Sequence, residues 1–173
     1  MVRALWIGRF QPFHLGHLDM ARRILDDVDE LLIAVGSAQY SHTPDNPFTA
    51  GERIEMIRRA LEAERLKAYT VYPVTDTGVH SLWVAHVRAF LPPFDVVYTN
   101  SALVNRLFTE QRVKVLELPL WERDTHSGAE VRRRLREGGD WKSLVPRAVA
   151  EYLEASGGER RVREIGETRG AVP

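Results

Sequence analysis

Two short segments of the chain carry side chains that could bind phosphate groups and neutralise their charge. The first segment, residues 8–17 (GRFQPFHLGH), contains Arg9, His14 and His17. Because His14 and His17 are three residues apart, their imidazoles can point into the same space where the chain turns into a helix. Free N–H groups and the helix dipole favour anions at such a helix start. Histidine and arginine donors there are suited to hydrogen bonds with phosphate oxygens.

Two glycines of this segment fit the same interpretation. Gly8 ends an expected strand and, without a Cβ, leaves room for a ligand to approach the backbone. Gly16 lies near the first free N–H groups of the expected helix. Two histidines three residues apart are also common on ordinary protein surfaces, so their spacing alone does not establish a function.

The second segment, residues 127–132 (SGAEVR), is expected to open a helix. Ser127 followed by Glu130 is the pattern of a capping box, in which each side chain accepts a free backbone N–H of the helix start. The apolar positions of this helix face the core, which leaves Arg132 near the exposed helix start. Its guanidinium carries a fixed, planar fork of hydrogen-bond donors. A capped surface helix with a basic face would show the same pattern.

The elements that must position these segments alternate along the chain. Apolar runs predict buried strands over residues 4–8, 31–36, 70–74, 95–99 and 113–116. Apolar residues on one face predict helices over residues 15–25, 50–61, 81–90 and 127–135. Strict alternation of strand and helix indicates a parallel sheet with helices on both faces, a doubly wound α/β fold. Such sheets bind ligands at the carboxyl ends of their strands, where the first segment is expected.

Composition narrows the classes of protein to which the chain can belong. Lys and Arg together number 24, as do Asp and Glu, so the net charge is zero, which disfavours a nucleic-acid binder despite the run Arg132-Arg133-Arg134. The absence of cysteine excludes disulfides, thiolate metal sites and cysteine nucleophiles. No cluster of Asp, Glu and His indicates a metal site held by the protein. No apolar run reaches the ~18 residues of a membrane span, so we expect a soluble, cytoplasmic protein.

The chain is long enough for one domain, which we expect to cover residues 1–155. Residues 156–173 (SGGERRVREIGETRGAVP) are Gly-rich, charged and almost without apolar side chains. They predict a mobile tail, with a helix that docks onto a neighbouring subunit as the alternative.

The first two segments together resemble the nucleotidyltransferase superfamily, the α/β phosphodiesterases that carry an HxGH motif. Residues 8–17 match the signature G-R-F-x-P-x-H-x-G-H, and residues 127–132 resemble the second signature, Ser-x-Thr-x-Ile-Arg, with Ala129 in place of the threonine. The resemblance implies that His14, His17 and Arg132 are catalytic. It also implies the following ATP-binding residues: Gly8, Arg9, Phe10, His14, Gly16, His17, Ser127 and Arg132.

A third segment, residues 36–53, resembles the archaeal-type nicotinamide-nucleotide adenylyltransferases more specifically, and within it Thr49 and Glu52 form a second capping-box pattern. The resemblance continues through residues 81–84, 92–95 and 144–146 and covers about residues 3–155. It implies ATP and nicotinamide mononucleotide as substrates, NAD and pyrophosphate as products, and Mg²⁺ carried by the ATP phosphates. It also implies a homo-oligomer, specifically a hexamer.

The same resemblance implies that Ser37, Phe48 and Trp83 bind the mononucleotide, with Trp83 stacked on the nicotinamide ring. Trp83 as core filler beside its apolar neighbours is the competing interpretation. Besides Ala129, the chain departs from the family pattern at His80, where asparagine is usual, and at Asn100-Ser101. Other transferases of the superfamily, which act on phosphopantetheine or use CTP, and a nucleotide-sensing module without activity remain alternatives.

Overall fold

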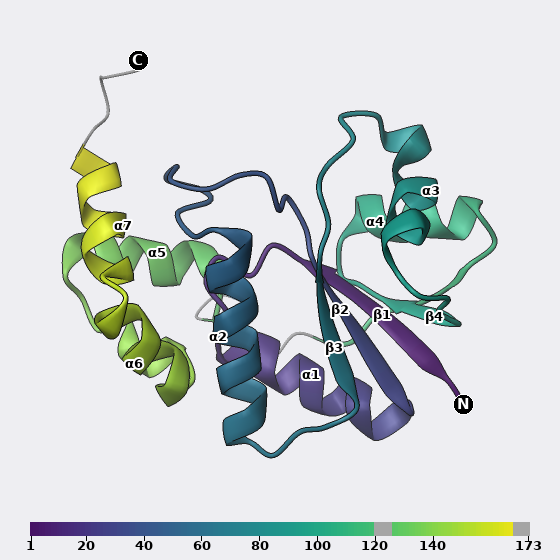
Figure 1. Cartoon of the computed structure of the whole chain (residues 1–173), viewed down its shortest axis with the longest axis horizontal. Helices are drawn as coiled ribbons and strands as arrows, with labels where there is room; N and C mark the ends of the chain where they lie inside the picture. The colour runs from purple at the N-terminus through teal and green to yellow at the C-terminus, as the bar shows by residue number, and fades with distance from the viewer. Residues whose placement is uncertain (120–125, 168–173) are drawn as a thin grey trace.

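A computed structural model describes residues 1–119 and 126–167 of the chain (Figure 1). The elements follow one another in this order: β1 (Arg3–Gly8), α1 (Leu15–Asp27), β2 (Glu30–Val35), α2 (Ala50–Ala63), β3 (Tyr69–Pro73), α3 (His80–Phe90), β4 (Val96–Tyr98), α4 (Ala102–Glu110), β5 (Lys114–Leu116), α5 (Gly128–Glu137), a short 3₁₀ turn (Lys142–Leu144), α6 (Arg147–Ala155) and α7 (Gly158–Glu167). Every predicted strand and helix is present, with boundaries within a few residues of those expected.

The five strands form one parallel sheet in the order β3-β2-β1-β4-β5. The order reverses between β1 and β4, because the chain moves outward in one direction from β1 to β3 and then returns to the other side of β1. Ligands of doubly wound sheets bind at this reversal, beyond the carboxyl ends of the strands. The first histidine segment leaves β1 at that point, so the predicted fold class is confirmed.

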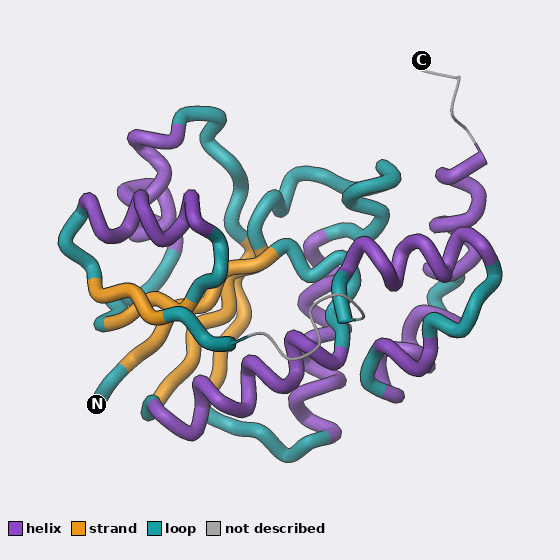
Figure 2. The backbone as a smooth tube through the Cα atoms, turned by 180° about the vertical axis from the view of Figure 1, so that it is seen from behind, coloured by secondary structure: helices purple, strands orange, loops and turns teal. Residues whose placement is uncertain are grey.

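Helices cover both faces of the sheet (Figures 1 and 2). Successive strand residues point to opposite faces: Ala4 and Trp6 of β1 face the core shared with α1 and α2, whereas Leu5 faces the core shared with α3 and α4. Buried residues of α5 and α6 extend the first of these cores beyond the sheet. The two faces together hold β1 rigidly, and β1 is the strand that delivers the histidine segment.

Helix α7 corrects the expectation of a mobile tail from residue 156 onward. Val162 is buried, and Nη1 of Arg161 lies 2.7 Å from Oε2 of Glu52 in α2. Nε of Arg163 donates to the carbonyl of Leu135 in α5 at 3.3 Å. The helix therefore packs on α5 and α6 of its own chain and contacts α2 through Arg161. The domain boundary expected at residue 155 falls inside the folded region. Residues 168–173 of the expected tail lie outside the described residues.

Within residues 1–119 and 126–167, no helix has the length and apolar character needed to cross a membrane.

Candidate active site

The loop between β1 and α1 is built around the buried ring of Phe10. This residue has a φ of 52°, and its ring packs edge-on against Trp6 at 5.0 Å and against His17 at 4.9 Å. A Cβ on Gly8 would lie 2.8 Å from Cζ of Phe10. The absence of a side chain at Gly8 therefore leaves room for the Phe10 ring of its own loop. The Phe10 side chain supports the site from the core, so only its backbone can face a ligand.

His14 and His17 share one space, as their spacing predicts. Their rings stack with centroids 3.6 Å apart and an interplanar angle of 23°. Gly16 makes room for this arrangement, because a Cβ there would lie 3.1 Å from Cε1 of His14. The backbone N–H of His14 donates to Nδ1 of His17 at 3.3 Å. Because Nδ1 of His17 accepts that bond, a neutral His17 carries its proton on Nε2 and presents an N–H donor there.

Burial keeps both imidazoles neutral. It lowers the pKa of His14 to about 3, with a smaller contribution from the charge of His126. Burial, followed by the charge of His14, lowers the pKa of His17 well below its usual range. Nδ1 of His14 is buried without a hydrogen-bond partner within the described part of the chain. The pair thus offers uncharged hydrogen-bonding groups, and positive charge must come from arginine.

Arg132 brings the second segment against the first. Its Nη1 donates to the carbonyl of Gln11 at 2.8 Å, and its side chain is 9% exposed, whereas the sequence predicted an exposed position at the helix start. Burial, followed by the charge of Arg9, lowers the pKa of Arg132. Nη2 of Arg132 also lies 3.8 Å from the carboxylate of Asp45, and Arg9 donates to the side chain of Asn46 at 3.5 Å. Two guanidinium groups from distant parts of the sequence therefore meet beside the histidine loop.

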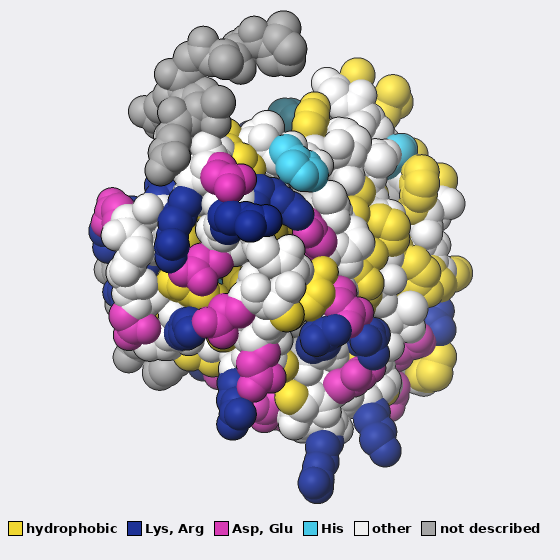
Figure 3. Space-filling model, turned by 60° about the vertical axis from the view of Figure 1, so that its left-hand side comes forward, with side chains coloured by type: hydrophobic (Ala, Val, Ile, Leu, Met, Phe, Trp, Pro, Cys, Tyr) yellow, Lys and Arg dark blue, Asp and Glu magenta, His cyan; other side chains and the backbone are white. Residues whose placement is uncertain are grey.

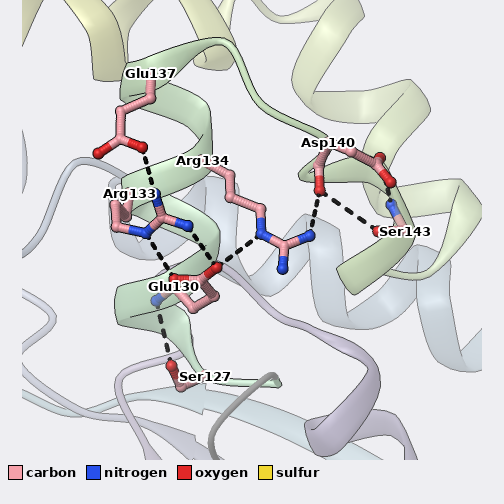
Figure 4. Close-up of polar contacts among 7 residues, drawn as sticks. All are labelled: Ser127, Glu130, Arg133, Arg134, Glu137, Asp140 and Ser143. Atoms are coloured by element: carbon pink, nitrogen blue, oxygen red, sulfur yellow. Dashed lines mark hydrogen bonds and ion pairs between the residues drawn. The ribbon is translucent and has the colours of Figure 1, made fainter.

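The start of α5 is capped more simply than predicted. The Ser127 hydroxyl accepts the backbone N–H of Glu130 at 3.2 Å. The Glu130 carboxylate does not complete the capping box; it pairs with Arg133 at 2.8 Å and with Arg134 at 2.7 Å (Figure 4). Arg133 and Arg134 are thus neutralised along the helix, and Arg132 is the guanidinium of this run that turns toward the first loop. Close approach of the helix start is possible because residue 128 is a glycine, where a Cβ would lie 3.1 Å from the carbonyl oxygen of Gln11.

The loop after β2 contains one expected ligand contact that the structure does not support. The Phe48 side chain is completely buried in the core, so it is not available to bind a mononucleotide. Its backbone N–H and carbonyl pair with the side-chain amide of Gln11 at 3.0 and 2.9 Å. Just beyond it, the predicted capping box of Thr49 and Glu52 is confirmed, with both reciprocal bonds present. The hydrogen bonds between the Phe48 backbone and the Gln11 side chain thus anchor this loop to the histidine segment.

A cleft of about 520 Å³ opens beside Arg9 of the histidine loop. Arg9, Ser37 and Trp83 all line it, and His80 and Leu103 complete the side formed by α3 and α4. Trp83 is half-buried, with one edge packed against Phe108 at a centroid distance of 5.7 Å. The sequence left open whether Trp83 stacks on the nicotinamide ring or fills the core; in the structure its ring packs against Phe108 and also lines the cleft.

The other departures from the family pattern lie around this region. Ala129 is exposed in the first turn of α5. Nδ2 of Asn100 donates to the carbonyl of Leu118 at 2.8 Å, and Ser101 caps α4 by accepting the N–H of Val104. Asn100 and Ser101 therefore hold the loop after β4 in place.

Arg53 is a residue near the site that the sequence interpretation did not single out. It is fully buried in the first turn of α2 and donates to backbone carbonyls of both strand-end loops. Its burial could have been predicted from the sequence. Arg53 precedes the buried Ile57 by four residues and Ala60 by seven, and it therefore lies on the apolar face of α2. Elsewhere in the described ranges, no group of three or more His, Asp or Glu side chains could hold a metal ion.

Comparison with known proteins places these features in a family. Residues 5–134 match the model of the cytidylyltransferase-like family. The chain is 49% identical to a nicotinamide-nucleotide adenylyltransferase of Thermoplasma volcanium over 99% of this chain and 96% of that protein. It is 48% identical to the enzyme of the same name from Methanolobus tindarius over 97% of this chain and 96% of the relative.

The fold also matches a solved structure of a bifunctional NMN adenylyltransferase/ADP ribose pyrophosphatase from Francisella tularensis, crystallised with AMP and a manganese ion. The TM-score is 0.72 at 19% identity, over 96% of this chain. The chain spans 53% of the Francisella chain, about half its length.

Proposed function

We propose that this chain, which belongs to the cytidylyltransferase-like family, is a nicotinamide-nucleotide adenylyltransferase that makes NAD and pyrophosphate from ATP and nicotinamide mononucleotide. The observation that carries the proposal is the meeting of His14, His17, Arg9 and Arg132 at the carboxyl end of β1, beside a cleft lined by Trp83. The near full-length relatives that bear this name support the choice of acceptor.

The reaction needs positioning and charge neutralisation from the protein. A phosphate oxygen of the mononucleotide attacks the α-phosphorus of ATP, the bond from that phosphorus to the bridging oxygen breaks, and pyrophosphate leaves with the electron pair. As in phosphoryl transfer, holding the two reactants in line and stabilising the departing charge account for most of the acceleration. No covalent intermediate on the protein is required.

In this proposal the ATP phosphates bind between the two motif segments. Neutral His17, and His14 beside it, donate hydrogen bonds to the phosphate oxygens, and Arg9 and Arg132 supply the positive charge that the buried imidazoles lack. Ser127 and the backbone around Gly8, Phe10 and Gly16 complete the expected contacts of the ATP subsite, the N–H groups at the helix starts favouring anions.

The acceptor binds in the adjoining cleft. Ser37 and Trp83 line it, and the exposed face of the Trp83 ring stacks on the nicotinamide. Phe48 acts only through the loop that it anchors. Because the cleft also contains Arg9, the phosphate of the mononucleotide approaches the ATP phosphates near that guanidinium.

Mg²⁺ enters with ATP as part of the substrate. The residues of the described chain offer no cluster of metal ligands, and Mg²⁺ usually keeps several waters and binds through substrate phosphates. When bound there, it neutralises phosphate charge. The Francisella tularensis relative was crystallised with AMP and a manganese ion, which supports the use of a divalent cation.

Two further properties belong to the same proposal. We expect a cytoplasmic homo-oligomer, specifically a hexamer, and exposed apolar side chains on α3 and α4, among them Leu82, Phe90 and Leu103, offer surface for subunit contacts. Light scattering on the purified protein measures the oligomeric state. We also expect no nucleic-acid partner, because the net charge of the chain is zero; on the face that Figure 3 draws, basic and acidic side chains are interspersed.

An acceptor panel tests the proposed reaction. The protein is incubated with ATP, Mg²⁺ and one acceptor at a time: nicotinamide mononucleotide, nicotinic acid mononucleotide or phosphopantetheine, with CTP replacing ATP in a parallel series. We expect a dinucleotide and pyrophosphate in equal amounts with ATP and nicotinamide mononucleotide. Product only with phosphopantetheine, or only with CTP, would show that the chain is another transferase of the superfamily. Binding of ATP without product would favour a nucleotide-sensing module.

A further inference from the structure

We propose that Arg53 is a positioning residue that fixes the ATP loop and the acceptor loop relative to each other, so that the two substrates meet in line. This inference rests on the proposed function, because it assigns ATP to the loop after β1 and the mononucleotide to the loop after β2.

The Arg53 guanidinium joins three separate segments of backbone. Nη1 donates to the carbonyls of Arg9 and Gly36, each at 2.8 Å, and Nη2 donates to the carbonyl of Ser37 at 3.1 Å. Nε donates to the carbonyl of Thr49 at 3.2 Å, at the start of its own helix. A single planar group thus connects the end of β1, the end of β2 and the start of α2.

Two of the residues held in this way, Arg9 and Ser37, line the cleft. The side chains of Arg9 and Ser37 both face it, and the guanidinium of Arg53 contacts only their carbonyl oxygens from the buried side. Ser37 has a φ of 49°, a left-handed conformation that serine rarely adopts. The bond to its carbonyl helps to hold that conformation and therefore the direction of its side chain.

The energetics indicate a role beyond filling the core. The side chain is completely buried, although Ile57 and Ala60 on the same face of α2 are apolar. Burial, followed by the charge of Arg9, lowers the pKa of Arg53 to about 10, while Asp76 opposes the shift. The group remains charged at neutral pH. Burial of a charged group costs free energy, and an apolar residue would fill the same space at a smaller cost. The charged side chain therefore serves the hydrogen bonds that its guanidinium makes to the backbone.

The test compares Arg53→Lys with a matched control, Arg58→Lys. Lysine keeps the charge but carries three donors on one nitrogen, which cannot span carbonyls on three segments. Arg58 lies in the same helix and pairs at the surface with Glu55 and Glu62. Steady-state kinetics with each substrate varied, thermal melts and calorimetric titration with MgATP are measured for both variants and the unaltered protein.

We expect Arg53→Lys to fold and to lose kcat/KM by about 10²-fold, the scale on which a displacement near 1 Å disturbs reacting groups. The KM values of both substrates should rise and kcat should fall, whereas Arg58→Lys should match the unaltered protein. A lower melting temperature with unchanged kcat and KM values would show that Arg53 only stabilises the fold and would overturn the proposal.

A second variant, Arg53→Gln, covers the case in which the lysine variant does not fold. Glutamine keeps two donors in a plane and is uncharged, and this variant should show the same rise in both KM values. If neither variant folds, Arg53 is a determinant of the fold and the positioning role is refuted. Calorimetric titration with MgATP separates a failure of this inference from a failure of the proposed reaction. If the unaltered protein binds ATP but makes no NAD, the titration still shows whether Arg53→Lys weakens ATP binding. An unchanged affinity for ATP would refute the positioning role of Arg53.

Discussion

Replacement of Trp83 by alanine separates the two contacts that this side chain makes. Its ring lines the cleft, and one edge packs against Phe108 at 5.7 Å. Loss of a stack on the nicotinamide removes about 1–3 kcal/mol, which raises the KM for the mononucleotide by roughly 5- to 150-fold. The KM for ATP should change little, and kcat at saturating acceptor should fall only modestly, the pattern of lost uniform binding.

The cost in stability follows from the partial burial of Trp83. An edge-to-face aromatic pair contributes about 0.5–1.5 kcal/mol, less than the ~3–5 kcal/mol for a fully buried tryptophan or phenylalanine truncated to alanine. At ~2–4 °C per kcal/mol for a chain of this size, the melting temperature should fall by roughly 1–6 °C.

The assay varies each substrate in turn and is paired with a thermal melt. Trp83→Phe is the first control, because it keeps an aromatic face and should recover most of the acceptor affinity. Phe108→Leu is the second, because it removes the packing partner and should lower the melting temperature with little change in either KM. A large fall in melting temperature for Trp83→Ala with both KM values unchanged would refute the stacking role.

Three further predictions concern α7, the buried histidines and Asp45. Arg161→Ala removes the 2.7 Å contact with Glu52, whose carboxylate caps the start of α2. A thermal melt should show a clear loss of stability in this variant and none in Arg160→Ala, which changes an exposed neighbour. Equal melting temperatures would mean that α7 packs without this ion pair. The pKa of His14 is about 3 in the folded state and ~6.5 in the unfolded chain, so the unfolded state binds more protons between these values. The contribution of neutral His14 to the free energy of unfolding is therefore fully present above pH 6.5 and is lost as the pH falls toward 3. Melts from pH 7 to pH 4 should show this loss and His14→Asn should reduce it, whereas an identical pH dependence in the variant would contradict the buried neutral state. Asp45→Asn removes the carboxylate 3.8 Å from Arg132. Asp45 is 83% exposed, so solvent screens the pair and its contribution is at most about 1 kcal/mol. The KM for ATP should therefore fall by no more than about fivefold, and a rise would mean that Asp45 assists ATP binding.

The sequence predicted the sheet well because its strands are short, continuous apolar runs with the alternating helices between them. The resemblance implied ATP-binding residues in both motif segments, and the bond from Arg132 to the carbonyl of Gln11 brings these two segments into contact. Helix α4 was not predicted, although its cap residue Ser101 was a usable signal, because Phe108 is the one fully buried residue that the helix presents. Helix α6 was missed despite Pro146 at its start and the buried spacing of Val149 and Leu153.

The errors share a physical cause, because they depend on contacts between distant segments. Helix α7 buries little apolar surface and docks through Arg161 and Arg163 onto elements far away in the sequence. Phe48 was expected to contact the mononucleotide, but its loop folds back and places the ring in the core. Periodicity and local motifs do not specify such contacts.

The turnover of His17→Ala and Arg132→Ala tests most directly whether the two motif segments form one catalytic site. Each variant removes a preorganised donor to developing charge, so kcat should fall by about 10²–10³-fold while the folded state persists in a thermal melt. Arg133→Ala serves as the matched control, because Arg133 neighbours Arg132 but pairs at the surface with Glu130. Turnover should be normal in that control and should show the large loss in the other two variants. Near-normal turnover in His17→Ala or in Arg132→Ala would contradict a shared catalytic site.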